Sequence, residues 1–277
     1  MPNTFGSKLE SAFEAYGQLC VGIDPHVTLL EDWSLPDSGQ GLLDFGRYVI
    51  EAASGRVGIV KPQVSFFERH GSAGFAALEA LTHEARDAGL LVIADAKRGD
   101  IGTTMSAYLD AWLGRNAPFY ADTLTVSPYL GADVYISQFT DYLERGKGLI
   151  SLVATSNPEG ERVQLDVAAN QWATLGKVNQ IVAGAGDKLG PFGAVIGATL
   201  NLSRFGINVE DQGGVKTPIL APGFGAQGAQ LDDIKRIFGA AANSVIASVS
   251  RSVLEAGAAG IVGAIESAKL ELERALG

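Results

Sequence analysis

The sequence predicts an α/β protein that folds as a single (β/α)₈ TIM barrel domain spanning residues 1–277. Short runs rich in β-branched and other apolar residues recur along the chain, and the segments between them carry apolar residues at helical spacing. Near-continuous apolar strands that alternate with helices are typical of a parallel sheet covered on its outer face. Eight such units match a closed barrel, which typically needs about 250 residues.

No linker, low-complexity tract or sequence repeat separates the strand candidates into two domains. The clearest helical segments between them are residues 74–89 and 167–186. A doubly wound open sheet remains the alternative, because the order of short apolar runs within a sheet is hard to establish from sequence. In chain order, the eight strand candidates are residues 19–24, 57–62, 90–95, 120–128, 149–156, 193–200, 217–223 and 244–250.

Composition and charge disfavour several classes of protein. Hydrophobic residues make up 47% of the chain, enough for a substantial core, and the net charge of −10 argues against a nucleic-acid or anionic-membrane partner. A phosphorylated substrate needs only local positive charge and stays open. The N-terminal segment lacks the apolar stretch of a signal peptide, and no run approaches the length of a membrane span. We therefore expect a soluble, cytoplasmic protein.

The glycine-rich loop "APGFGAQG" (221–228) is a candidate anion site. It contains G-x-G-x-x-G as Gly223, Gly225 and Gly228, follows the seventh strand candidate and precedes the helix-like "LDDIKRIFG". Glycines let the backbone approach an anion. The pattern is weak alone in a chain with 35 glycines, but barrels often bind phosphate after strands seven and eight. Its place after the seventh strand therefore favours one phosphate over a dinucleotide, whose glycine loop follows the first strand.

Polar residues end several of the apolar runs, and in a barrel such residues converge on one mouth. The densest group is "DAKRGD", where Asp95 and Lys97 share one face of a strand and Asp100 follows beyond the turn at Gly99. A lysine between carboxylates stays protonated, which makes Lys97 a proton donor. On spacing alone, a solvated loop explains this group as well as catalysis does. The strand-end residues are Asp24, Lys61, Asp95, Lys97, Ser156, Asn157, Gln227 and Arg251.

Several other kinds of site have no signal. His26, His70 and His83 lack the companions of a zinc motif, and neither a Walker A lysine nor a G-x-S-x-G elbow is present. We expect no metal site. Cys20, the single cysteine, lies in an apolar run, so a buried and unreactive thiol is expected there.

The segment "DAKRGDIGTT" resembles the D-x-K-x-x-D-I-x-x-T signature of the orotidine 5′-phosphate decarboxylase family at Asp95, Lys97, Asp100, Ile101 and Thr104. The resemblance continues through "VGIDP", "IVKPQVSFFE", "TSNP", "APGFGAQG" and "SR", over about residues 18–255, and the longer "DAKRGD" form looks like the bacterial branch. It implies a phosphate-binding (β/α)₈ barrel that needs no metal or organic cofactor. It also implies a small-molecule nucleotide substrate and a homodimer with shared active sites.

The resemblance also implies roles for the residues near the reacting carbon. Lys61 would extend a charged chain to Asp95, which would lie beside the substrate carboxylate, and Lys97 would protonate the carbon that loses it. Asp100 and Thr104 would enter from the partner subunit. The product would be uridine 5′-monophosphate, made in de novo pyrimidine biosynthesis.

Other residues would bind the rest of the nucleotide. Asp24, together with Lys61, would hold ribose hydroxyls, and Ser156 would contact the pyrimidine. Gln227 and Arg251 would grip the phosphate beside the glycine loop. Asn157 departs from the histidine that many relatives have after that serine, which leaves the contacts to the base open.

Three alternatives stay open. A magnesium-dependent sugar-phosphate decarboxylase or aldolase of the same superfamily shares Asp-x-Lys-x-x-Asp, but normally has an extra acidic ligand where this chain has Lys61. An NADP-binding oxidoreductase would use the glycine loop and Arg251 for a dinucleotide. A catalytically silent phosphate-binding barrel is disfavoured by the intact set of Asp95, Lys97 and Asp100.

Overall fold

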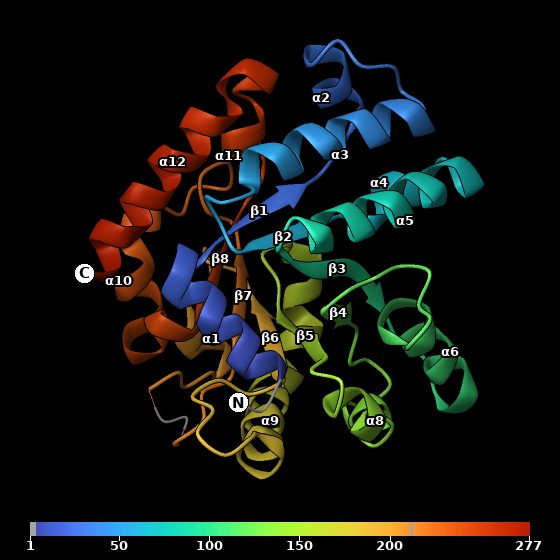
Figure 1. The fold of residues 1–277 in the computed structure, drawn as a ribbon. Helices are drawn as coiled ribbons and strands as arrows, with labels where there is room; N and C mark the ends of the chain where they lie inside the picture. Colours follow the sequence, from blue (N-terminus) through green and yellow to red (C-terminus); the bar gives the residue numbers. More distant parts are fainter. Residues whose placement is uncertain (1–3, 211–212) are drawn as a thin grey trace.

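The structure, a computed structural model, describes residues 4–210 and 213–277. Its strands form a closed parallel barrel in chain order, with β1 paired to both β2 and β8 (Figure 1). The predicted (β/α)₈ barrel is confirmed, and the open-sheet alternative is wrong because the sheet closes between β8 and β1. The strands are β1 (Leu19–Ile23), β2 (Ile59–Pro62), β3 (Leu91–Arg98), β4 (Thr123–Val126), β5 (Gly148–Ala154), β6 (Phe192–Ile196), β7 (Ile219–Pro222) and β8 (Val245–Val249).

Helices surround the barrel, and the two segments predicted as helical are helical. The first, predicted as 74–89, lies in α5 up to the end of that helix at Asp87. The second, predicted as 167–186, is the later part of α9, which begins at Pro158 and ends at Val182. Between β6 and β7 the described residues form a 3₁₀ helix, η1 (Leu202–Phe205). The other helices are α1 (Phe5–Tyr16), α2 (Val27–Asp32), α3 (Gly39–Ala53), α4 (Val64–Glu68), α5 (Gly71–Asp87), α6 (Gly102–Leu113), α7 (Asp133–Ile136), α8 (Thr140–Leu143), α10 (Ile234–Phe238), α11 (Arg251–Leu254), α12 (Gly257–Leu276), η2 (Leu231–Asp233) and η3 (Gly239–Ser244).

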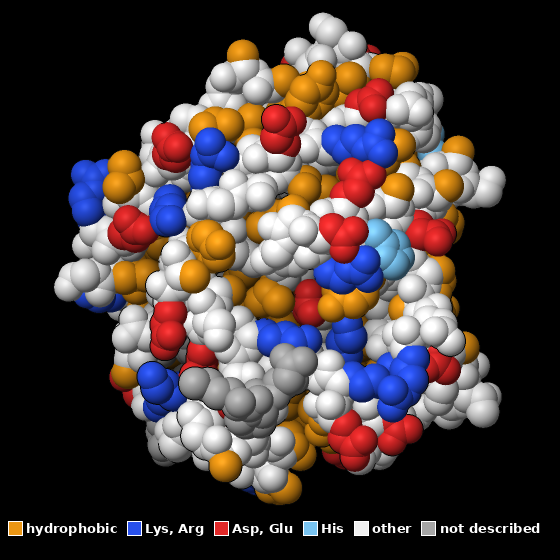
Figure 2. Space-filling view, in the orientation of Figure 1, with side chains coloured by type: hydrophobic (Ala, Val, Ile, Leu, Met, Phe, Trp, Pro, Cys, Tyr) orange, Lys and Arg blue, Asp and Glu red, His pale blue; other side chains and the backbone are white. Residues whose placement is uncertain are grey.

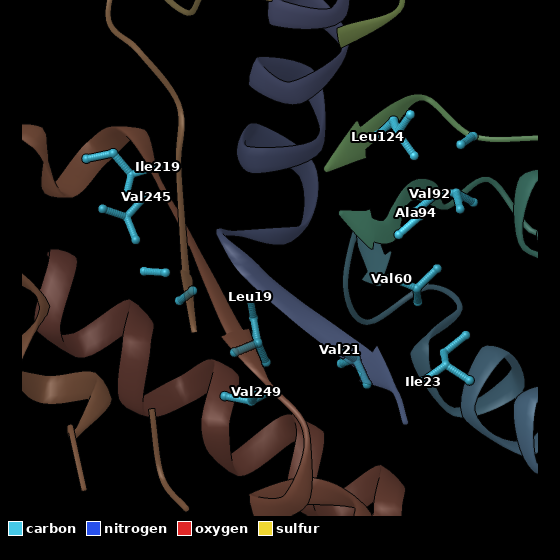
Figure 3. Close-up of a cluster of buried hydrophobic side chains, with 14 of the residues drawn as sticks. Leu19, Val21, Ile23, Val60, Val92, Ala94, Leu124, Ile219, Val245 and Val249 are labelled. Carbon is cyan, nitrogen blue, oxygen red and sulfur yellow. The ribbon is translucent and has the colours of Figure 1, made fainter. Parts of the chain in front are cut away.

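The core has two layers, because successive strand residues point to opposite faces of the sheet. Leu19, Val21 and Ile23 of β1 belong to the cluster that packs between the strands and the surrounding helices (Figure 3). Cys20 belongs instead to the cluster inside the barrel. Burial on both faces explains why the strands read as continuous apolar runs. The strand residues of the inner cluster are Cys20, Ile59, Ile93, Ile150, Val195, Leu220 and Ile246.

Helix α1 closes the N-terminal end of the barrel. Thr4 caps this helix by accepting a hydrogen bond from the Ser7 amide, at 3.0 Å. Phe5 and Leu9 pack into the inner cluster, and Phe5 lies against Gly148 at the start of β5. With one end closed in this way, the interior opens at the C-terminal ends of the strands.

The surface carries mixed charge. On the face drawn in Figure 2, basic and acidic side chains are interspersed, without the extended basic area that nucleic acid binding requires. Among the helices of the described residues, none is long and apolar enough to span a bilayer.

Candidate active site

A cavity of about 540 Å³ opens at the C-terminal ends of the strands. Most of the site residues predicted from the sequence line it, although they come from six different strands and the loops that follow them. Asp100, Thr104 and Gly225 are not among its lining residues. The predicted residues that the cavity brings together are Asp24, Lys61, Asp95, Lys97, Ser156, Asn157, Gly223, Gln227 and Arg251.

A larger groove of about 740 Å³ lies beside this cavity, between residues 198–203 and α10. Its charged residues, Asp233 and Arg236, form an ion pair with each other at 2.9 Å. Because the chemically reactive residues line the smaller cavity instead, the smaller cavity is the candidate active site.

The alternation of the strands explains the polar layer at the cavity floor. Ile59 and Ile93 belong to the inner cluster, so Lys61 and Asp95, two residues further along, point into the barrel one layer closer to its mouth. Gly22 follows Cys20 in the same way. On β2 and β3 the last inward layer of the barrel is therefore charged where the layer below it is apolar, whereas Leu152 of β5 adds an apolar side chain to the cavity wall.

Lys61, Asp95 and Lys97 form a chain of alternating charge on this floor. The Nζ atom of Lys61 lies 3.0 Å from Asp95 Oδ2, and that of Lys97 lies 2.6 Å from Asp95 Oδ1. Lys61 and Asp95 are buried, with relative exposures of 6% and 9%. A buried carboxylate is stable when its charge is compensated at short range, and Asp95 meets this condition on both oxygens.

The pKa values of the two buried members reflect this pairing. Burial alone would raise the pKa of Asp95, but the ammonium groups of Lys61 and Lys97 lower it to about 2. Burial would likewise lower the pKa of Lys61, but the carboxylates of Asp95 and Asp24 raise it above the usual value of a lysine. Asp95 and Lys61 are therefore both charged at neutral pH.

A bulge in β3 brings Lys97 to Asp95. The β3–β4 register passes from Ala94↔Leu124 directly to Arg98↔Val126, so residues 95–97 of β3 lie opposite a single residue of β4. Lys97 has φ +51°, a left-handed conformation that is rare outside glycine and costs on the order of 1–3 kcal/mol. The two side chains meet as predicted, but through this bulge rather than through regular strand alternation.

Two buried polar atoms face the cavity without a hydrogen-bond partner among the described residues. They are Asp24 Oδ1 and Ser250 Oγ, which belong to residues that both line the cavity. The residues converge above Gly22, where a Cβ atom would lie 3.0 Å from Ser250 Cβ and 3.2 Å from Asp24 Oδ1. Buried polar atoms are normally hydrogen-bonded, so this pair fits a hydroxyl group of a ligand.

The glycine loop follows β7, two strands along the barrel from β5. Gly223 and Gly225 have φ values of +115° and +70°, which other residues rarely adopt. Gln227 Oε1 accepts a hydrogen bond from the Ser156 hydroxyl at 3.0 Å, which joins this loop to the loop after β5. The cavity is lined by the loop itself rather than by the start of the helical segment that follows it, and Arg251 at the start of α11 completes this side.

Sequence reasoning missed several residues that line or support the cavity. Gln63 Oε1 lies 3.4 Å from Lys97 Nζ, and its place two residues after Lys61 was the available signal. Gln164 reaches back from α9 to Thr155, donating to its hydroxyl at 2.7 Å and accepting from its amide at 2.8 Å. No local pattern marks Gln164, because its partner lies nine residues earlier in a loop.

Asp100 and Thr104 lie outside the cavity of their own chain. Asp100 Oδ1 accepts a hydrogen bond from the neighbouring Ile101 amide at 2.8 Å, and Thr104 is exposed on α6. Cys20, as expected, is fully buried, and burial raises the pKa of its thiol to about 12. Among the described residues, no three His, Cys, Asp or Glu side chains gather where they would hold a metal ion.

Comparison with known proteins identifies relatives along most of the chain. The family profile described as orotidine 5′-phosphate decarboxylase / HUMPS matches residues 17–263. The orotidine 5′-phosphate decarboxylase of Streptomyces coelicolor is 48% identical over 262 residues, covering 91% of this chain and 90% of that protein. The enzyme of the same name from a Nocardioides species is 45% identical over 257 residues, covering 90% of this chain and 91% of that protein.

Solved structures agree with these relatives. A crystal structure described as orotidine 5′-phosphate decarboxylase from Streptomyces avermitilis superposes with a TM-score of 0.91 at 46% identity, covering 99% of this chain and 96% of that one. The corresponding Toxoplasma gondii structure gives a TM-score of 0.82 at 26% identity, covering 99% and 98%. The chain belongs to the orotidine 5′-phosphate decarboxylase / HUMPS family.

Proposed function

We propose that this chain is a carboxy-lyase that converts orotidine 5′-monophosphate to uridine 5′-monophosphate in de novo pyrimidine biosynthesis, with Lys97 as the proton donor. The observation that carries the proposal is the charged chain on the cavity floor, in which Asp95 lies between the ammonium groups of Lys61 and Lys97 at 3.0 and 2.6 Å. Membership of the family supports the same reaction.

The geometry suits this decarboxylation. Loss of carbon dioxide leaves an electron pair on carbon 6 of the pyrimidine, with no adjacent carbonyl to delocalise it. A fixed ammonium at that carbon stabilises the developing negative charge, and Lys97 then transfers its proton to the carbon. Asp95 lies beside the departing carboxylate and holds the Lys97 ammonium in place.

The other end of the cavity suits the ribose 5′-phosphate. Asp24 Oδ1 and Ser250 Oγ offer unpartnered polar atoms to ribose hydroxyls. Arg251, Gln227 and the glycine loop provide a guanidinium, an amide and accessible backbone for the phosphate. Binding energy gained at the phosphate draws the substrate carboxylate into a site that already holds Asp95.

The direct test mixes the purified chain with orotidine 5′-monophosphate and follows the loss of orotate absorbance, with uridine 5′-monophosphate identified as the product. Lys97→Ala provides the matched control and should be nearly inactive. The proposal fails if the native chain binds the nucleotide and forms no uridine 5′-monophosphate.

The alternative is a magnesium-dependent sugar-phosphate decarboxylase or aldolase of the same superfamily. Such an enzyme needs an acidic metal ligand near the end of the second strand, and in this chain Lys61 places an ammonium there, 3.0 Å from Asp95. A divalent cation next to that ammonium is electrostatically unfavourable. The donor set therefore favours a reaction that uses the lysines themselves.

We predict that decarboxylation needs no added metal. Activity on orotidine 5′-monophosphate should be unchanged after exhaustive chelation, because Lys61 and Lys97 supply the positive charge that a metal would otherwise provide. The comparison is between chelated protein and the same protein with magnesium restored. A requirement for magnesium would transfer the chain to the sugar-phosphate branch.

We also propose a homodimer in which Asp100 and Thr104 complete the site of the partner subunit. Both residues lie outside the cavity of their own chain. Apolar side chains are exposed nearby, in the neighbouring loops after β3 and β4: Ile101 is 59%, Tyr129 82% and Leu130 51% exposed. A second copy that covers them would bring Asp100 with it.

A cytoplasmic location belongs to the same proposal, because a charged nucleotide substrate does not cross a lipid bilayer unaided.

A further inference from the structure

Thr125 lies on the inward face of β4, directly opposite the bulge that carries Asp95 and Lys97. It is fully buried, and it is the single β4 residue between the pairs Ala94↔Leu124 and Arg98↔Val126. Its hydroxyl therefore faces a segment of β3 in which the regular strand pairing is interrupted.

The Thr125 hydroxyl contacts both Asp95 and Lys97. The backbone N–H of Lys97 donates to Thr125 Oγ1 at 2.9 Å, and Thr125 Oγ1 donates to Asp95 Oδ1 at 3.0 Å. The Ala94 carbonyl is a second acceptor at 3.4 Å. A hydroxyl has one proton to donate. The Asp95 carboxylate is both the nearer and the charged acceptor, so Thr125 donates its hydrogen bond to Asp95.

These two hydrogen bonds fix the backbone of Lys97 and the carboxylate of Asp95. The first bond gives a partner to the amide of Lys97, whose left-handed backbone has left the regular β ladder. The second bond fixes the Asp95 oxygen that also accepts from Lys97 Nζ at 2.6 Å. One hydroxyl thus links the backbone and the ammonium of Lys97 through Asp95.

We propose that Thr125 is a positioning residue that sets the Lys97 ammonium and the Asp95 carboxylate in their reactive geometry without touching the substrate; this rests on the roles proposed above for Asp95 and Lys97. Thr125 is absent from the cavity wall, so it acts through these two groups. Small misplacement of a proton donor lowers the rate of the chemical step more than it lowers binding.

The first experiment replaces the hydroxyl with a methyl of similar size, as Thr125→Val. We expect kcat for orotidine 5′-monophosphate to fall at least about tenfold, equivalent to roughly 1.4 kcal/mol. The Kd for uridine 5′-monophosphate should stay within about threefold of the native value, because phosphate and ribose binding do not involve Thr125. A purely structural defect would weaken product binding and turnover together.

Thr123→Val is the matched control. Thr123 lies on the same strand and is equally buried, but its hydroxyl has no hydrogen-bond partner in the part of the chain that is described. Its replacement should leave kcat within about twofold of the native enzyme. A loss at position 123 as large as the loss at 125 would overturn the proposal, because it would show that β4 tolerates no such change.

A second pair of variants separates the loss of the hydroxyl from the change in packing. Thr125→Ser and Thr125→Ala differ in the hydroxyl and share the loss of the methyl, so the serine variant should be at least about tenfold faster. This comparison decides the question even if Thr125→Val does not fold. Equal rates for serine and alanine, with an active native enzyme, overturn the role of Thr125, whereas an inactive native enzyme overturns the proposed function itself.

Discussion

At the scale of single residues, Asp95 compensates the charge of both lysines in the site. Its two oxygens neutralise one ammonium each, from Lys61 and Lys97. Removing one member of a buried ion pair typically costs about 3–5 kcal/mol, because the other charge is left without compensation. Lys97, whose side chain is 44% exposed, is the most accessible member of the chain and the one that we propose as the proton donor.

Arg251 is the residue at which phosphate binding can be tested alone. Replacing it with alanine would remove the charge-assisted contact that we propose with the phosphate, so kcat/KM for orotidine 5′-monophosphate should fall at least about tenfold, or roughly 1.4 kcal/mol. Orotidine, which lacks the phosphate, should be affected much less. Steady-state kinetics on both substrates provide the measurement.

Arg236→Ala is the matched control for this change. Arg236 is an exposed arginine of the neighbouring groove and is paired with Asp233. Its loss should leave kcat/KM nearly unchanged. If Arg251→Ala reduces turnover of both substrates equally, Arg251 acts elsewhere than on the phosphate.

At the scale of elements, the glycine loop and α11 are fitted closely to each other. A Cβ atom on Gly225 would lie 2.6 Å from Cβ of Ser252, the residue after Arg251. Gly225 does not line the cavity, so its contribution is to let the loop approach the start of α11. This approach sets the distance between the loop backbone and the Arg251 guanidinium.

Gly225→Ala should therefore raise KM for orotidine 5′-monophosphate several-fold by separating the loop from α11. The double variant Gly225→Ala with Ser252→Gly should recover most of this loss, because the nearest remaining atom would be Ser252 Cα at 4.0 Å. The measurement is a double-mutant cycle on KM. Additive losses without recovery would mean that backbone strain at φ +70°, rather than the steric contact, limits the loop.

The elements also show what sequence can predict. The strands could be located because burial on both faces makes their apolar runs continuous, as in β8 with its fully buried pattern. The bulge in β3 could not, because it is defined by pairing with β4, which lies about 30 residues away and carries no matching signal. The start of α9 at Pro158 could have been predicted from the sequence, because proline is typical of the first helical position.

Site residues at strand ends could be predicted from the sequence, whereas residues that act through partners in the fold could not. Lys61, Asp95 and Lys97 stand at strand ends and fit a motif. Thr125 and Gln164 do not, because each acts through partners that only the fold brings near: Thr125 through Asp95 and Gln164 through Thr155. The spacing of neighbouring residues in the sequence does not predict contacts between different elements of the fold.

At the scale of the whole molecule, the proposed shared-site dimer makes a distinctive prediction. Lys97→Ala and Asp100→Ala should each be nearly inactive as homodimers. After co-refolding in equal amounts, half of the dimers are mixed, and each mixed dimer has one site with both native residues, so activity should reach roughly a quarter of the native value. If mixed dimers, verified by differential tagging, stay as inactive as their parents, Asp100 acts within its own chain.

Cys20 gives the closed barrel a built-in reporter of its own opening. It lies inside the barrel on β1, in register with Ile59 of β2 and Ser248 of β8, so a thiol reagent reaches it only when these strands part. Labelling kinetics therefore measure the opening equilibrium of the seam where the first and last strands join. If opening this seam destroys the binding site, uridine 5′-monophosphate at one hundred times its Kd should slow labelling about a hundredfold, or about 2.7 kcal/mol. A labelling rate that is indifferent to the nucleotide would mean that β1 can detach while the site stays assembled.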